Sequence, residues 1–81
     1  MRTEEILVII VDCCREVLPR LKSHAFEATD RLADLGADSV DRAEVVTMVL
    51  ERLSLTMPRT ELFGARNVGE LAELLARRCS A

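Results

Sequence analysis

The sequence has very few aromatic side chains and no long apolar run. Phe26 and Phe63 are the only aromatic residues among 81, and Trp and Tyr are absent. Because the apolar half is mostly Leu, Val, Ala and Ile, packed helices are favoured over a sheet, in which β-branched and aromatic residues alternate. The longest apolar run, Ile6–Val11, is too short to span a bilayer, and Glu4 and Glu5 before it are unlike the basic start of a secretory signal. We therefore expect a cytoplasmic protein that does not enter a membrane.

Clustered positive charge is also missing. The 11 Lys and Arg residues are mixed with 14 Asp and Glu residues, for a net charge of −3. Nucleic-acid binding needs a basic patch and aromatic side chains for base stacking, so we expect no nucleic-acid partner. The length suits a single domain over residues 1–81, which we expect to act as a monomer.

The cysteines and the histidine form no metal or redox motif. Cys13, Cys14 and Cys79 are an odd set in which the two neighbours would bridge only with severe backbone strain, and no CxxC spacing occurs. We expect reduced thiols that pack as small apolar residues, and no metal site. His24, the single histidine, is expected to be a solvated loop residue.

What the sequence does have is helical periodicity. Apolar residues recur at the spacing of one helix face in three long segments: 3–18, 39–53 and 67–78. We expect Thr3 to cap the first helix and Pro19 to end it. Residues 60–64 should form at most one short turn, and Asn67 should cap the last helix. Residues 19–38 form a long connection with three apolar anchors: Phe26, Leu32 and Leu35. The fold class predicted from this pattern is all-α.

The helix over residues 39–53 has two different sides. At about 100° per residue, its core side should consist of Ala43, Val46, Val49, Leu50 and Leu53. The opposite side should face solvent and consists of Val40, Glu44, Thr47, Met48 and Glu51. Apolar side chains rimmed by acids are suited to docking against a basic partner surface.

Residues 35–41 (LGADSVD) lead directly into this helix. Gly36 permits a turn, and Asp38 is a good N-cap with Asp41 in the capping-box position. Ser39 then sits at a helix N-terminus, where free backbone N–H groups and the helix dipole stabilise the negative charge of a phosphate. By itself, the motif fits a plain capped helix as well as a serine that carries a phosphate.

Over nearly its whole length, the chain resembles the acyl carrier protein family. The matching segments are residues 35–40 (LGADSV), 44–46 (EVV) and 67–71 (NVGEL), and the order of elements also matches. The first segment looks like the Gly-x-Asp-Ser-Leu pattern, whose serine receives 4′-phosphopantetheine from coenzyme A. The resemblance implies a four-helix bundle with a long loop between helices one and two and a short third helix.

The resemblance further implies that Ser39, next to Asp38, is the attachment point of a phosphopantetheine arm whose thiol holds acyl groups as thioesters. A separate phosphopantetheinyl transferase would add the arm, so the protein would be a substrate of enzymes and not an enzyme. An enzymatic role for Ser39 would need a base within hydrogen-bond reach, and the only histidine, His24, lies in the long loop.

Two short segments resemble one subgroup of this family in particular: residues 39–44 (SVDRAE) and residues 62–67 (LFGARN). In the first segment, Val40 stands where most family members have Leu. The two segments look like the free-standing donor carriers of polyketide β-branching cassettes. Such carriers present an acetyl group, which malonyl can supply, to a 3-hydroxy-3-methylglutaryl (HMG) synthase-like enzyme. An acyl transferase and a ketosynthase-like decarboxylase are further implied partners. The alternatives are an ordinary polyketide or fatty-acid elongation carrier, and a small helical interaction module in which Ser39 only caps.

The predicted partner-binding residues are Val40, Asp41, Arg42, Ala43, Glu44, Thr47, Met48 and Glu51. Glu44 and Glu51 should steer basic partners. Arg42, near the arm's phosphate, and the small Ala43 should let the synthase-like enzyme distinguish a donor carrier from an elongation carrier. Without such a role, Arg42 would be a solvated residue that pairs with Asp38 or Glu44.

Overall fold

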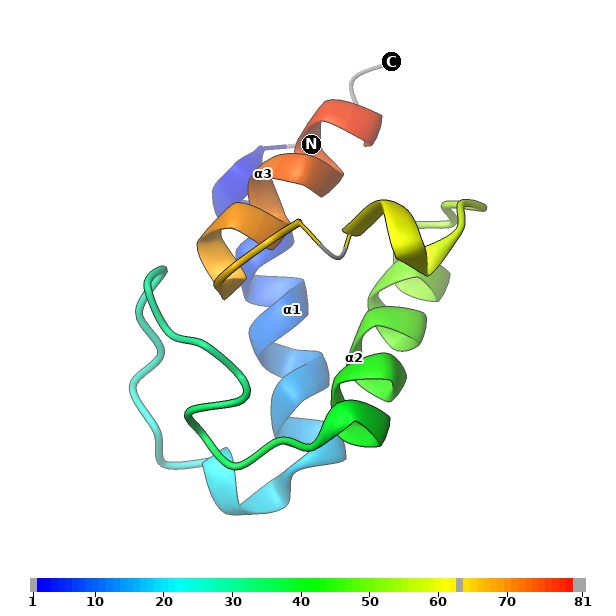
Figure 1. Cartoon of the computed structure of the whole chain (residues 1–81). Coiled ribbons are helices and arrows are strands. Elements are labelled where there is room, and N and C mark those ends of the chain that lie inside the picture. The colour runs from blue at the N-terminus through cyan, green and yellow to red at the C-terminus, as the bar shows by residue number, and fades with distance from the viewer. Residues whose placement is uncertain (1, 63, 80–81) are drawn as a thin grey trace.

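The computed structural model describes residues 2–62 and 64–79. They form three α-helices and two 3-10 turns: α1 (Thr3–Val17), η1 (Pro19–Leu21), α2 (Ser39–Arg52), η2 (Arg59–Leu62) and α3 (Val68–Cys79). α1 packs against both α2 and α3, and the long loop after η1 runs past the start of α3 before it enters α2 (Figure 1). The described residues contain no strand, so the all-α prediction is confirmed.

The predicted four-helix bundle is not confirmed, because the described residues contain three α-helices. In place of a short third helix, η2 is a single turn of four residues. Pro58 lies just before this turn, and Gly64 lies just after it. One turn between two helix-breaking residues makes too few hydrogen bonds to propagate an α-helix. Phe63, part of the 62–67 segment, lies outside the described residues.

The interior is aliphatic, as the composition predicts. Its fully buried side chains include Ile6, Ile10, Cys13, Cys14, Val45, Val49, Val68 and Leu75. Burial raises the pKa of Cys14 to about 12, so this thiol stays protonated at neutral pH and packs as an apolar group, as expected. The described residues hold no cluster of three or more metal-ligating side chains. None of the described helices is long and apolar enough to cross a membrane.

The ends of α1 differ slightly from the prediction. The helix begins at Thr3, so its N-cap is Arg2 and not Thr3. The backbone N–H of Arg2 donates to Glu5 Oε1 at 3.1 Å, which ties the acidic first turn to the cap. The helix ends at Val17, because Pro19 disfavours the helical conformation at the residue before it.

The long loop is held by contacts around Phe26. The His24 ring meets Phe26 edge-on with ring centroids 4.8 Å apart, and the Arg15 guanidinium lies 5.5 Å from the centre of the Phe26 ring. His24 Nε2 lies 2.9 Å from Asp30 Oδ2. The prediction of a solvated His24 is therefore wrong, because an aromatic neighbour and an acidic partner within the loop keep the ring half-buried.

The same loop docks on the start of α3. The backbone N–H of Gly69 donates to Ala28 O at 2.8 Å, and that of Val68 donates to Asp30 O at 3.0 Å. The loop thus satisfies two of the N–H groups that a helix leaves free at its start. A Cβ at position 69 would lie 2.8 Å from Ala28 O, so this close approach requires glycine.

Arg20 ties the other end of the loop to the turn before α2. Its Nη2 donates to Leu35 O at 3.3 Å and to Gly36 O at 2.9 Å. Gly36 has a φ of +89°, in the left-handed region that favours glycine. Phe26, Leu32 and Leu35 pack against buried core residues, as predicted. The loop therefore sets where α2 begins.

The buried side of α2 is rotated relative to the prediction. Val45 is fully buried, whereas Ala43 and Val46, which were expected in the core, are only half-buried. Val49 and Leu50 are buried as predicted. The difference arises because Ala43 and Val46 line a pocket and are not packed closely against α3.

Candidate functional site

Ser39 is the first residue of α2, and the cap of this helix leaves its side chain free. The backbone N–H of Asp41 donates to Asp38 Oδ1 at 2.8 Å, and the backbone N–H of Asp38 donates to Asp41 Oδ2 at 3.2 Å. The predicted capping box is confirmed. Ser39 is exposed, and its hydroxyl has no hydrogen-bond partner within the described residues.

The start of α2 fits a phosphate. Within residues 2–62 and 64–79, the backbone N–H groups of Ser39 and Val40 have no acceptor. Free N–H groups at a helix N-terminus, together with the helix dipole, stabilise an adjacent anion. A phosphate ester on the Ser39 hydroxyl would lie beside these groups, so the residues present fit a phosphate-linked arm.

Arg42 lies one turn after Ser39 on the same side of α2, since residues three apart on a helix are neighbours. Its Nη1 donates to Ala37 O at 2.9 Å, and the side chain is half-buried. It pairs with neither Asp38 nor Glu44, so the interpretation of Arg42 as a solvated ion-pair residue is wrong. The Ala37 carbonyl, at the end of the loop, draws the guanidinium away from both acids.

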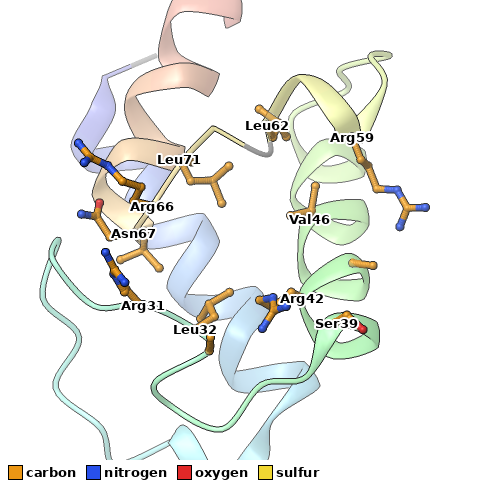
Figure 2. Close-up of a pocket in the computed structure, with 14 residues that line it drawn as sticks. Arg31, Leu32, Ser39, Arg42, Val46, Arg59, Leu62, Arg66, Asn67 and Leu71 are labelled. Carbon is orange, nitrogen blue, oxygen red and sulfur yellow. The ribbon is translucent and has the colours of Figure 1, made fainter.

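A pocket of about 560 Å³ opens beside Ser39, between α2, the long loop and the start of α3. Its apolar lining includes Leu32, Val46, Leu62, Val68 and Leu71. Its charged lining consists of four arginines: Arg31, Arg42, Arg59 and Arg66. Figure 2 shows Arg42 between Leu32 and Ser39, and the guanidinium of Arg59 directed away from the opening. No acidic residue lines this pocket, so its charge is positive.

One of these arginines is already paired. Arg66 donates to Glu70 Oε1 from its backbone N–H at 3.1 Å and from Nε at 3.4 Å, and its Nη2 lies 3.3 Å from Oε2. The backbone N–H of Arg66 is the main reason that the pKa of Glu70 is lowered; the Arg66 side chain adds to this, and the nearby charge of Arg31 contributes less. Asn67 Oδ1 accepts from the Glu70 N–H at 2.8 Å, so the predicted N-cap of α3 is confirmed.

The side of α2 away from the pocket carries an exposed row of residues, which we call the outer strip: Val40, Glu44, Thr47 and Glu51. Val40 is 71% exposed. The other predicted partner-binding residues lie elsewhere: Arg42 and Ala43 line the pocket. Asp41 is half-buried in the cap. Met48 was expected to face solvent, which is wrong, because it lies on the flank of α2 and packs against the core.

The arginines across the pocket from Ser39 were not predicted from the sequence. Arg31 lies in the long loop, Arg59 in η2, and Arg66 just before α3. Folding alone brings these three separate segments to one pocket, and no regular spacing in the sequence marks them. The docking of the loop on α3 is what places Arg31 there.

Comparisons with known proteins identify the family of this chain. The family model for phosphopantetheine attachment sites matches residues 8–75. The polyketide biosynthesis acyl-carrier-protein AcpK of Bacillus subtilis (strain 168) is 63% identical over 68 residues, which are 84% of this chain and 82% of AcpK. A chain in the crystal structure of the curacin biosynthetic pathway HMG synthase in complex with acetyl donor-ACP matches with a TM-score of 0.92 and 52% identity, over 95% of this chain and 99% of that chain.

The helical fold and the attachment-site match define a protein of the phosphopantetheine-carrying class. More specifically, the chain belongs to the acyl carrier protein family, as its resemblance implies, and its cofactor is covalently attached 4′-phosphopantetheine from coenzyme A. The resemblance to the donor carriers of polyketide β-branching is also confirmed, since a matched structure pairs an acetyl donor carrier with an HMG synthase.

Proposed function

We propose that Ser39 carries the phosphopantetheine arm and that the protein donates an acetyl group to an HMG synthase-like enzyme in polyketide β-branching. The observation that carries the attachment is the free Ser39 hydroxyl at the capped start of α2, beside N–H groups that have no acceptor within the described residues. The donor role is supported by the 52% identity to a chain in a structure described as an HMG synthase with its acetyl donor carrier.

In this proposal, the residues around Ser39 position the reaction that attaches the arm. Asp38 holds the first turn of α2 and so directs the Ser39 hydroxyl outward. The Ser39 oxygen forms a new bond to the phosphorus that bears the pantetheine group of coenzyme A. The pyrophosphate bond breaks, adenosine 3′,5′-bisphosphate leaves, and the hydroxyl proton passes to the transferase. The free N–H groups of Ser39 and Val40 then stabilise the phosphodiester charge.

The protein acts in this proposal as a carrier and not as an enzyme. It holds the acetyl group as a thioester, and the synthase-like enzyme supplies the nucleophile that takes it. An acyl transferase and a ketosynthase-like decarboxylase would supply the acetyl group, if it arises from malonyl. We further propose that residues 1–81 form one carrier domain, that it is monomeric and cytoplasmic, and that η2 serves as the short third helix of the family.

The outer strip is the proposed docking surface. Val40 offers exposed apolar contact, while Glu44 and Glu51 place two carboxylates on the same side of α2. An acidic strip around an apolar contact suits a basic partner, because complementary charge accelerates encounter and orients the two proteins. Arg42 lies on the pocket side, so it would act on the arm more directly than on the partner surface.

Intact mass spectrometry tests the attachment. Apo-protein incubated with coenzyme A and a phosphopantetheinyl transferase should gain one phosphopantetheine, and Ser39→Ala should gain none while its circular dichroism stays helical. Ser23→Ala, which removes another exposed serine, is the matched control and should load normally. An arm on Ser39→Ala would disprove the attachment site. No arm on the wild type would favour the interaction-module alternative.

The donor role needs a second experiment. The acetyl-loaded protein should transfer its acetyl group to the active-site cysteine of the synthase-like enzyme much faster than an acetylated elongation carrier does. Exchanging Arg42→Thr together with Ala43→Val should reduce this preference without affecting arm attachment. Failure as a donor, combined with efficient use by a ketosynthase, would support the elongation-carrier alternative.

A further inference from the structure

The pocket beside Ser39 is positively charged, and the proposed carrier role does not explain this charge. Its lining combines aliphatic side chains with arginines and contains no acidic residue. Aliphatic walls bind the apolar part of a ligand, and a guanidinium group forms charge-assisted hydrogen bonds with a carboxylate or a phosphate. A suitable ligand therefore has an apolar body and an anionic end.

The arginines are not equivalent. Arg66 is occupied by Glu70, and the guanidinium of Arg59 points away from the opening (Figure 2). Arg42 is the arginine next to Ser39, and it would face the phosphate of an arm attached there. Arg31 remains: it is exposed, and its side chain has no hydrogen bond or ion pair within the described residues.

Arg31 is held on the far side of the pocket from Ser39. The hydrogen bond from Val68 N to Asp30 O, 3.0 Å long, fixes the neighbouring residue against α3. Figure 2 shows Arg31 and Asn67 together on the α3 side of the opening. The Asn67 side chain accepts the Glu70 N–H through Oδ1, which leaves its NH₂ group as a second donor on that side.

The pocket begins at Ser39, so an arm attached there could fold back into it. Its lining extends along α2 from Ser39 to Val46 and on to Leu62 of η2. The segment of α2 from Ser39 to Val46 is about 10 Å long, at the rise per residue of an α-helix. An arm that starts at Ser39 and lies over the aliphatic wall would direct its free end toward the α3 side, where Arg31 lies.

We propose that this pocket holds a carboxylate-ended acyl group, of the malonyl type, on the folded-back arm, with Arg31 as the partner of the carboxylate. The proposal rests on the attachment at Ser39. An acetyl group has no anion for Arg31 to hold, so an acetyl-loaded arm leaves the pocket more readily and is available to a partner enzyme. The pocket thus distinguishes the two acyl groups by charge.

Amide NMR of the loaded protein tests this proposal. The arm is attached from malonyl-coenzyme A or from acetoacetyl-coenzyme A, whose terminal methyl group replaces one carboxylate oxygen and removes the charge. Relative to the unacylated arm, the shift changes at Val68 and Leu71 should be about two- to fivefold larger with malonyl, as one partly exposed ion pair allows. This difference should largely disappear at about 1 M salt, where exposed charges are screened.

Two variants complete the experiment. Arg31→Gln should reduce the malonyl shift changes to the acetoacetyl level, while Arg77→Gln, which removes an exposed arginine of α3 that does not line the pocket, should leave them unchanged. Equal shift changes for the two acyl groups in the wild type would overturn the proposal, as would an equal loss in both variants. Intact mass separates the two hypotheses: a missing arm on Ser39 refutes the proposed function, whereas an arm without malonyl-dependent shifts refutes only this inference.

Discussion

The two sides of α2 are built in different ways. The outer strip consists of residues of α2 alone, is exposed, and includes Glu44 and Glu51. The pocket side combines Ser39 and Arg42 of α2 with arginines from the long loop, η2 and the segment before α3. One helix therefore presents an acidic surface to solvent on one side and a basic, partly apolar hollow on the other.

This difference predicts which substitutions act on which side. The pocket side depends on the docking of the loop on α3 at Gly69 and on the turn at Gly36, which Arg20 holds. Changes at these positions should disturb the pocket before they disturb the outer strip. Changes within the outer strip should alter association with a partner and leave the fold intact.

Gly69→Ala should have the largest effect on stability. The added Cβ would lie 2.8 Å from Ala28 O and 2.9 Å from Ala28 Cβ, so the loop backbone would have to move and its bond to Gly69 N would be lost. We expect the free energy of unfolding to fall by about 1–2 kcal/mol, after allowing for the helix propensity of alanine. Urea denaturation measures this loss.

Gly64→Ala is the matched control, because a Cβ at Gly64 would have no atom within 4 Å. Amide shift changes in Gly69→Ala should concentrate at pocket residues such as Arg31 and Val68, and be small along the outer strip. An equal loss of stability in both variants, or shift changes spread evenly over both sides of α2, would contradict the comparison.

Gly36→Ala should have the next largest effect. The φ of +89° at Gly36 strains any residue with a Cβ, and the Cβ would also lie 2.7 Å from the Nη2 of Arg20. Because Arg20 is a flexible side chain, most of the expected loss of about 1 kcal/mol comes from the backbone. Gly36→Asn should lose less, since Asn adopts left-handed conformations more readily than Ala. An equal loss for Asn and Ala would assign the cost to the clash with Arg20.

The features predicted correctly from the sequence are those that local chemistry determines. Asp38 and Asn67 cap their helices because their side chains reach N–H groups only three residues away. α1 ends before Pro19 because the ring restricts the preceding residue. The Ser39 position follows from the same short-range rules, so it was found without knowledge of the tertiary structure.

The errors concern contacts between distant segments. Periodicity places Val46 in the core with Val49, but α1 covers the Val45 side and leaves Val46 at the pocket. His24 looks like a solvated residue until the loop folds and brings Asp30 to its ring. Arg31 reaches the pocket only because the loop docks on α3. None of these arrangements leaves a regular spacing in the sequence.

The free energy of unfolding at acidic pH should depend on Asp30, which lies in the long loop. Its pKa is lowered, first by the hydrogen bond that Oδ2 accepts from the backbone N–H of Glu27 and then by His24. A carboxyl group with a lowered pKa in the folded state stabilises the protein above its unfolded-state pKa, which is about 4. That contribution is lost as the pH falls through the lower, folded-state pKa.

Asp30→Asn should therefore flatten the dependence of the unfolding free energy on pH below about pH 4. Urea denaturation at a series of pH values measures the slope. Asp34→Asn is the control, because Asp34 is exposed and its carboxylate has no hydrogen bond within the described residues. If both variants keep the wild-type slope, the loop contacts of Asp30 do not contribute to the pH dependence.

Glu44→Lys should have the smallest effect on stability and a clear effect on association. Glu44 is exposed in the middle of the outer strip and forms no ion pair within the described residues, so the free energy of unfolding should change by less than about 0.5 kcal/mol. Reversing its charge removes part of the attraction to a basic partner. Acetyl transfer to the synthase-like enzyme at low salt should slow by up to about tenfold, and its dependence on salt should weaken.

Glu73→Lys makes the same change in charge at an exposed site on α3 and should react nearly as fast as the wild type. If acetyl transfer slows equally in both variants, net charge and not the outer strip controls association. The two sides of α2 would then not differ in function as the structure indicates.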